Sequence, residues 1–227
     1  MKAETASGKI KQRPGNACPG RCFHIDKKKI NSYHKGRNSD FGNNKRQLLP
    51  GKSRGMNMEF KEVIKARYSC KKYGDRKVEP EKLNAILAAG RLAPTAKNLQ
   101  EQHVYVLQSA EALAKFDAVT PCRYGAPTVL LVAFDKYNVF TYPGGKRNSG
   151  IEDATIVATH MILAVADEGV DSCWINNLDP DQLAADLGLP ENEEILMAMD
   201  LGYAAEGVGP LPNHSSRKDL SDTVSYI

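Results

Sequence analysis

The sequence has few of the features that stabilise secreted or membrane-spanning proteins. Its five cysteines are an odd number without regular spacing, which argues against a disulfide framework and favours a reducing compartment. No stretch approaches the roughly 18 apolar residues that a membrane span needs. The N-terminus also lacks the apolar centre of a secretory signal. We therefore expect a cytoplasmic protein with no membrane partner.

Aromatic residues are scarce where basic residues are most abundant. Residues 1–57 contain fourteen Lys or Arg against three acidic residues, but only three aromatic residues. Proteins that bind single-stranded nucleic acid combine basic grooves with aromatic side chains on which bases stack, so we do not expect a nucleic-acid partner. Cys18 and Cys22 have two histidines downstream, but a Cys-x3-Cys pair is frequent by chance, and we expect no metal site.

Hydrophobic patterning is absent from residues 1–57 and regular after them. The first segment has no apolar run longer than two residues and is rich in Lys, Gly, Asn and Ser, so it cannot bury enough surface to offset its ordering entropy. Residues 58–227 carry seventeen basic against twenty-four acidic residues. We predict a basic, disordered N-terminal extension over 1–57 and one domain over 58–227. Whether the extension is a functional tail or an upstream addition without function stays open.

Apolar spacing divides the second segment into helices and strands. The patterns predict helices at residues 60–67, 80–94, 149–169 and 179–188, and strands at residues 103–107, 129–134, 171–175 and 195–203. Asn57 is a candidate cap for the first helix, and Pro80 suits the first turn of the second. There are too few β-α-β units for a doubly wound sheet, so the pattern predicts an α+β fold.

The helix predicted at residues 149–169 is apolar over most of its circumference. Ser149 with Glu152 has the spacing of a capping box, and Gly169 suits the C-terminal end. Such a helix is expected to be buried on nearly all sides, in a core and at a subunit interface. His160 lies in this helix, and we expect it to be an interior histidine. Asp179 and Gly188 are expected to cap the following helix.

The segment Arg67–Tyr73 places cations and a hydroxyl within a few residues of each other. Arg67, Ser69 and Lys71 alternate along it, and a terminal phosphate is bound by cations and hydrogen-bond donors acting together. Taken alone, the segment is more typical of a solvated basic turn. The chain has no Gly-x-Gly-x-x-Gly motif after a strand, and Gly144-Gly145-Lys146 lacks the first half of a P-loop.

The order of several short motifs resembles the FMN-dependent nitroreductase family. Arg67–Tyr73 is followed by Pro94–Gln100, then by the long apolar helix and finally by Arg217. Members of that family open with Arg-x-Ser-x-Arg/Lys-x-Phe/Tyr, continue with Ala-Pro-Ser-x-x-Asn-x-Gln and end on a basic residue. The resemblance covers Met58–Ile227, and it implies a nitroreductase-like α+β fold with a central, mostly antiparallel sheet flanked by helices in an intertwined homodimer.

The resemblance also implies roles for individual residues, all in binding FMN. The phosphate and ribityl chain would be bound by Arg67, Tyr68, Ser69, Lys71 and Arg217. A loop that reaches the flavin from the partner subunit would contribute Pro94, Thr95 and Asn98. The segment that passes the flavin N5 edge would contain Trp174, Asn176 and Asn177. A backbone N–H of Asn176 or Asn177 would bond to N5, while Trp174 is either a flavin contact or a core residue.

No catalytic side chain is expected, because the flavin N5 carries the chemistry. The implied reaction takes hydride from NADH or NADPH and reduces a small organic acceptor, such as a nitro compound or a quinone, by a ping-pong mechanism. An enone or another flavin is an alternative acceptor, and a non-catalytic flavin-binding or interaction protein is the alternative class. Three departures from the family pattern put the acceptor in doubt: Thr95, Glu101-Gln102 and Asn176.

Overall fold

The computed structural model describes residues 58–227, which lie within the second of two units of the chain, Gly51–Ile227. The predicted N-terminal extension, the Asn57 cap and the Cys18–Cys22 pair lie outside the described residues, so these points stay predictions. Among residues 58–227, no helix is long and apolar enough to cross a membrane.

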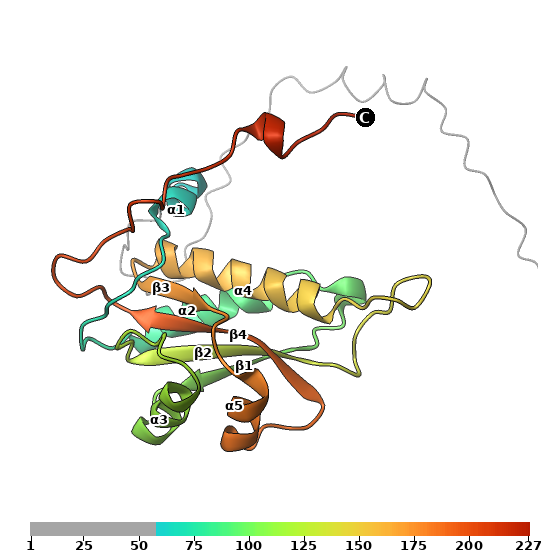
Figure 1. Ribbon diagram of the computed structural model, residues 1–227, viewed down its shortest axis with the longest axis horizontal. Coiled ribbons are helices and arrows are strands. Elements are labelled where there is room, and N and C mark those ends of the chain that lie inside the picture. Colours follow the sequence, from blue (N-terminus) through green and yellow to red (C-terminus); the bar gives the residue numbers. More distant parts are fainter. Residues whose placement is uncertain (1–57) are drawn as a thin grey trace, which may run out of the picture. The chain divides into compact units, whose positions relative to one another are not determined.

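The described chain forms five α-helices and four strands, with two short 3₁₀ turns (Figure 1). In chain order they are α1 (Phe60–Ala66), α2 (Pro80–Arg91), η2 (Ala96–Asn98), β1 (Gln102–Leu107), α3 (Ala110–Val119), β2 (Thr128–Asp135), α4 (Gly150–Asp167), β3 (Asp171–Ile175), α5 (Pro180–Leu187), β4 (Glu193–Gly202) and η3 (Leu220–Asp222). The four predicted helices and four predicted strands are confirmed. The sequence reasoning missed α3, although Ser109 caps it by accepting the Ala112 N–H at 3.1 Å.

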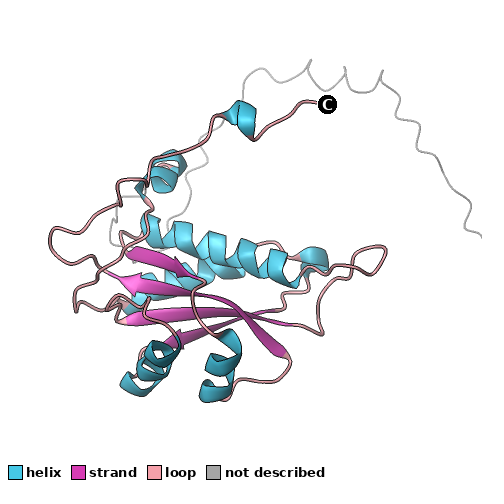
Figure 2. Cartoon of the chain, in the orientation of Figure 1, coloured by secondary structure: helices cyan, strands magenta, loops and turns pink. Residues whose placement is uncertain are grey.

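The strands form one antiparallel sheet in the order β1-β2-β4-β3 (Figure 2). The last strand in sequence, β4, therefore lies inside the sheet. The register between β2 and β4 shifts at Val132/Ala133, where a bulge interrupts the ladder. A single parallel bridge joins Ser69 to Ser172, so the chain before α2 runs beside the edge strand β3. The α+β class is confirmed.

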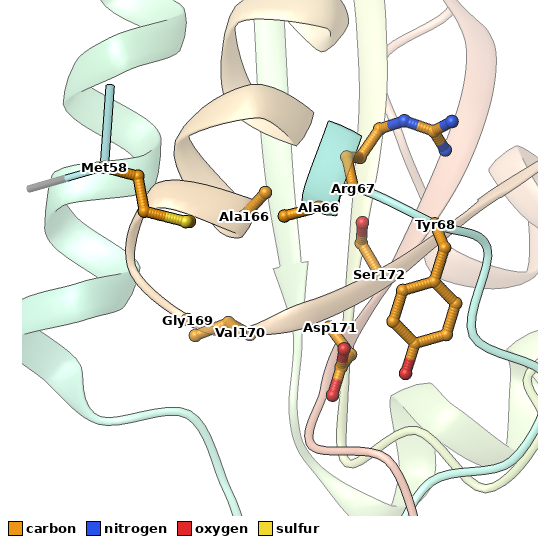
Figure 3. Close-up of a pocket in the computed structure, with 9 residues that line it drawn as sticks. All are labelled: Met58, Ala66, Arg67, Tyr68, Ala166, Gly169, Val170, Asp171 and Ser172. Atoms are coloured by element: carbon orange, nitrogen blue, oxygen red, sulfur yellow. The ribbon is translucent and has the colours of Figure 1, made fainter. Parts of the chain in front are cut away.

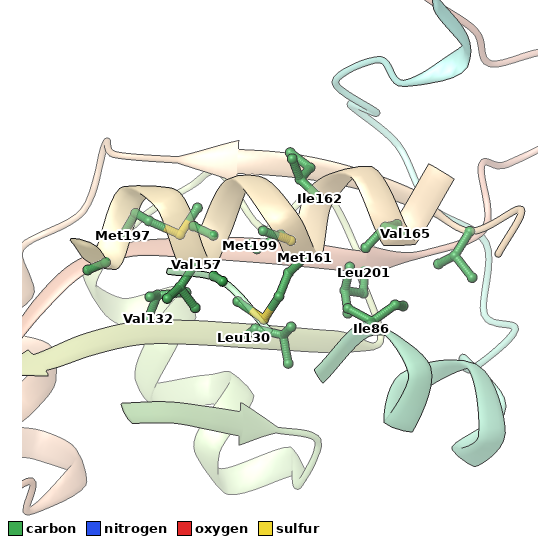
Figure 4. Close-up of a cluster of buried hydrophobic side chains, with 14 of the residues drawn as sticks. Ile86, Leu130, Val132, Val157, Met161, Ile162, Val165, Met197, Met199 and Leu201 are labelled. Atoms are coloured by element: carbon green, nitrogen blue, oxygen red, sulfur yellow. The ribbon is translucent and has the colours of Figure 1, made fainter. Parts of the chain in front are cut away.

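Helices cover both faces of the sheet, because side chains along each strand alternate between two cores. Figure 1 shows α2 and α4 on one face and α3 and α5 on the other. Figure 4 shows the first core, in which α4 side chains meet α2 and the sheet. Its fully buried members include Ile86, Leu130, Val132, Met161, Met197, Met199 and Leu201. The second core includes Phe116, Val129, Leu131, Cys173, Leu183 and Ala198.

The start of α4 differs from the predicted capping box, which is wrong. Ser149 has helical dihedrals (φ −87°, ψ −6°) and makes no side-chain cap. Its buried hydroxyl instead accepts the N–H of Phe140 at 3.2 Å, and Glu152 accepts a hydrogen bond from the Tyr142 hydroxyl. Both groups therefore hold the preceding hairpin rather than the helix end. The predicted glycine end is confirmed, since Gly169 has φ +64°.

Only part of the circumference of α4 is buried within this chain. Val157 and Met161 are in the core, whereas Ile151 and Ile156 are exposed by 56% and 36%. His160 is also exposed, and its Nδ1 lies 2.9 Å from the Ile156 carbonyl. The expectation of an interior histidine is therefore wrong within the single chain, because the face of α4 that carries it turns away from the sheet.

The caps predicted for α5 are confirmed. The Asp179 side chain accepts the Gln182 N–H at 3.0 Å, and Gly188 closes the helix in the left-handed conformation with φ +67°. This helix leads directly away from the end of β3. Its fixed start therefore also fixes where the residues after β3 lie.

Candidate functional site

The segment that begins at Arg67 is held along the free edge of β3. The N–H of Cys70 donates to the Ser172 carbonyl at 2.9 Å, and the N–H of Tyr73 donates to the Tyr124 carbonyl at 3.1 Å. These bonds fix an extended conformation in which the motif residues are spread along β3. The segment is therefore paired with its neighbours rather than a solvated turn, while its expected role in binding a phosphate stays a prediction.

A cavity of about 220 Å³ opens between this segment, the end of α4 and the start of β3 (Figure 3). It is lined by Met58, Ala66, Arg67, Tyr68, Ala166, Gly169, Val170, Asp171 and Ser172. Figure 3 shows Arg67 and Tyr68 on one side of the cavity and Met58 on the other. Within residues 58–227, the guanidinium of Arg67 takes part in no ion pair. Its positive charge is therefore available to a ligand.

Asp171 is the acidic group in the wall of this cavity. Its Oδ2 accepts the Ala204 N–H at 2.8 Å. Burial, together with the charge of Asp171, raises the pKa of the Tyr68 hydroxyl, which therefore stays neutral. The carboxylate is thus tied to the backbone and to Tyr68. The Tyr68 ring and the Arg67 cation are among the groups of the cavity wall that a ligand could contact.

Lys71 contacts neutral groups rather than a carboxylate. Its Nζ lies 3.1 Å from the Cys173 Sγ and 3.3 Å from the Tyr124 hydroxyl, and 4.5 Å from the centre of the Tyr124 ring. Burial alone would lower the pKa of Lys71, but the contacts with Cys173 and Tyr124 raise it overall. The ammonium group therefore stays charged beside β3.

The residues after β3 have their side chains fixed and their backbone donors free. Trp174 Nε1 donates to the Asn176 Oδ1 at 2.7 Å, and Asn177 Nδ2 donates to the Cys122 Sγ at 3.5 Å. The Thr120 hydroxyl donates to the Asn177 carbonyl at 2.5 Å. Among the described residues, the backbone N–H groups of Asn176 and Asn177 have no hydrogen-bond acceptor. Trp174 is half-buried and packs against the first core, so it has a structural role, while its contact with a flavin stays a prediction.

The loop that contains Pro94, Thr95 and Asn98 lies at the opposite end of α4. The N–H of Ala96 donates to Asp153, in the first turn of α4, at 2.9 Å. The cavity, in contrast, adjoins the last turn of this 18-residue helix, which spans about 27 Å at 1.5 Å per residue. A single chain therefore does not bring the two groups of residues together, as expected if the loop serves a partner subunit.

Arg217 lies in the exposed C-terminal tail. Its Nη1 donates to the carbonyls of His214 and Ser216, each at 2.6 Å. Both of these acceptors lie in the tail itself. Its proposed share in a phosphate site stays a prediction.

The structure adds two residues that the sequence reasoning did not place at this site. Both residues precede β2. Cys122 accepts a hydrogen bond from Asn177, and Tyr124 accepts one from Lys71. Hydrogen bonds, first with Tyr124 and then with Asn177, lower the pKa of the Cys122 thiol. No linear motif marks either residue, because their neighbours come from distant parts of the chain.

The chain thus forms an α+β fold, an antiparallel sheet between two layers of helices, with a basic segment along its edge strand β3. Residues 64–120 and 121–203, more than half of the chain, match the family model described as Nitroreductase family. The chain belongs to the nitroreductase family.

Three relatives illustrate the comparison. A nitroreductase family protein from Clostridium difficile is 37% identical with a TM-score of 0.70, over 74% of this chain and 98% of the other. A nitroreductase with bound FMN from Bacteroides fragilis is 26% identical with a TM-score of 0.61, over 75% and 99%. A protein of Methanothermobacter thermautotrophicus, provisionally named NADH dehydrogenase/NAD(P)H nitroreductase, is 29% identical over 161 residues, covering 67% and 81% of the chains.

Proposed function

We propose that this protein is an FMN-dependent oxidoreductase that takes hydride from NADH or NADPH and reduces a small organic acceptor. One observation carries the proposal. Two cations without a carboxylate partner, Arg67 and Lys71, lie along β3, and the same strand leads to free backbone N–H groups at Asn176 and Asn177. An extended ligand with a phosphate at one end and a hydrogen-bond acceptor at the other would pair with the cations and with the backbone N–H groups.

The chemistry of the donor set fits a flavin mononucleotide. Arg67 and Ser69 offer a guanidinium and a hydroxyl to the phosphate, and charge-assisted bonds of this kind are about twice as strong as neutral ones. Lys71 would add a second positive charge for the phosphate and the ribityl chain. Tyr68, as a neutral phenol, would add apolar surface without repelling the phosphate.

The rest of the binding site would come from a second copy of the chain. The cavity of about 220 Å³ is smaller than the 300–1,000 Å³ typical of ligand pockets. We propose a homodimer in which Pro94, Thr95 and Asn98 of one subunit reach the flavin held by the other. An amide such as Asn98 both donates and accepts, which suits the edge of the pyrimidine ring.

When bound, FMN supplies the hydride chemistry at its N5, with each substrate using the same pocket in turn. The residues of the chain would bind and orient it, and the cations beside β3 would favour a more negative reduced cofactor. No acid or base side chain is required for that role. The acceptor class stays open between nitro compounds, quinones and enones.

The test starts from the full chain as purified. A flavin absorbance spectrum, with FMN released on denaturation, is expected. Addition of NADH or NADPH should bleach that spectrum without oxygen, and a nitroaromatic compound or a quinone should restore it. A bound flavin that neither nicotinamide reduces would instead identify a non-catalytic flavin-binding protein, and absence of FMN binding would overturn the proposal.

A further inference from the structure

Two acidic side chains are buried against each other beneath the loop that contains Asn98. Glu101 and Asp153 are each only 5% exposed. Both carboxylate oxygens of Glu101 and the Oδ2 of Asp153 have no donor among the described residues. Buried acceptors without donors are rare, because each loses its hydration without compensation. A proton held between the two carboxyls would supply the missing donor.

No cation compensates this pair of acids. None of the ion pairs within residues 58–227 involves either carboxyl. The charged groups on the elements around the pair are engaged elsewhere. Lys97 in the loop lies over the Phe140 ring at 4.7 Å, Glu152 on α4 accepts from the Tyr142 hydroxyl, and Asp135 at the end of β2 accepts the Tyr137 N–H.

Two adjacent carboxylates in such surroundings cannot both be ionised at low cost. Burial, and then the neighbouring Asp153, raise the pKa of Glu101 from its ordinary value to about 7. Below that pH, Glu101 donates its proton to Asp153 and the pair carries a single charge. Above it, two negative charges face each other in the interior.

The pair is connected to the loop by one hydrogen bond. The Oδ1 of Asp153 accepts the Ala96 N–H at 2.9 Å. The residues that follow have left-handed backbones without being glycine: Lys97 at φ 54°, Asn98 at φ 56° and Gln100 at φ 52°. Such conformations persist only where the surroundings impose them, and they gather at ligand-binding segments. The anchor at Asp153 is one of the contacts that imposes them.

We propose that Glu101 and Asp153 share one proton and thereby hold the Thr95–Gln100 loop in the conformation that presents Asn98 to the flavin. Glu101 is thus a positioning residue whose loss of a proton releases the loop. The role of Asn98 rests on the proposed function; the coupling between the pair and the loop does not. The pKa of Glu101 is higher in the folded chain than in the unfolded chain, so protonation favours the folded state. The shared proton therefore stabilises the fold fully below the ordinary Glu pKa, and this contribution is lost as the pH rises through about 7.

Two measurements on the full chain test the coupling across about pH 6 to about pH 8. The first is hydrogen exchange at the Ala96 amide, corrected for its intrinsic rate, and the second is the FMN dissociation constant. In the wild type we expect amide protection to fall, and the dissociation constant to rise, by roughly tenfold, the scale of one pKa unit. Glu101→Gln keeps a donor towards Asp153 at every pH, so both profiles should become flat.

The matched control is Glu111→Gln on α3, where the carboxylate is exposed and paired with Lys115 at 2.9 Å; its profiles should follow the wild type. Asp153→Asn keeps an acceptor for Ala96 and serves as the second variant if Glu101→Gln does not fold. A Glu101→Gln or Asp153→Asn profile equal to that of the wild type overturns the proposal. A pH-dependent Ala96 amide in a chain that does not bind FMN supports the coupling and rejects the proposed function.

Discussion

At the scale of single residues, Arg67 offers the most direct test of the cofactor site. Its guanidinium lines the cavity and has no carboxylate partner within residues 58–227. If it binds the phosphate, Arg67→Ala should weaken FMN binding by roughly ten- to a hundredfold, the scale of a hydrogen bond to a charged group. Fluorescence titration measures this change.

Riboflavin supplies the control for that titration, because it lacks the phosphate. Its affinity should hardly change in Arg67→Ala, since the contacts of the ring are untouched. Arg217→Ala should behave in the same way if the tail folds over the phosphate, and the double variant should then lose less than the sum. Equal losses of FMN and riboflavin would reduce Arg67 to a structural cation.

At the scale of elements, α4 has one face in the core of its own chain and one face that is exposed. Met161 and Val157 point into the core of their own chain, where they are at most 1% exposed. Ile156 is on the outer face of the helix, exposed by 36%. Met161→Asp should therefore cost several kcal/mol and lower the melting temperature sharply, because it buries an unpaired charge.

Ile156→Asp tests the other face of the same helix. It should leave the fold of the single chain intact but shift the mass measured by light scattering from two chains towards one, with loss of flavin. Circular dichroism shows whether the fold is kept. A wild type that has the mass of one chain at micromolar concentration would contradict the homodimer.

At the scale of the whole molecule, the question is whether residues 1–57 contribute to the domain. They differ from the rest in charge and in hydrophobic patterning. A shortened chain that begins at Met58 should keep its FMN affinity and its melting temperature within error. A fall in either quantity would mean that the first segment packs on the domain.

Local rules in the sequence were sufficient for most elements of the fold. Helix α5 begins after the cap Asp179 and ends at Gly188, and α2 begins at Pro80. These ends were predictable because caps and proline act on the backbone of their neighbours in sequence. The apolar run of β2 predicted a buried strand from its composition alone. The capping box predicted at Ser149 did not form, because the Ser149 hydroxyl accepts the Phe140 N–H instead. Local rules cannot predict such a contact outside the helix.

The site could be named from the sequence only through its resemblance to a family. The order of short motifs identified Arg67, Ser69 and Lys71, but their spacing alone was more typical of a solvated turn. Tertiary structure placed them along β3 and brought Cys122 and Tyr124 beside them. It also paired Glu101 with Asp153, residues that carry no common motif.

The sequence by itself thus determined the class of fold, most of the elements and the family, because those depend on periodicity, caps and motif order along the chain. Tertiary structure decided which charges lack partners, which face of α4 stays open, and which carboxyls must share a proton. Each of these depends on distances between residues far apart in sequence, and on the loss of water around them, neither of which a linear pattern contains.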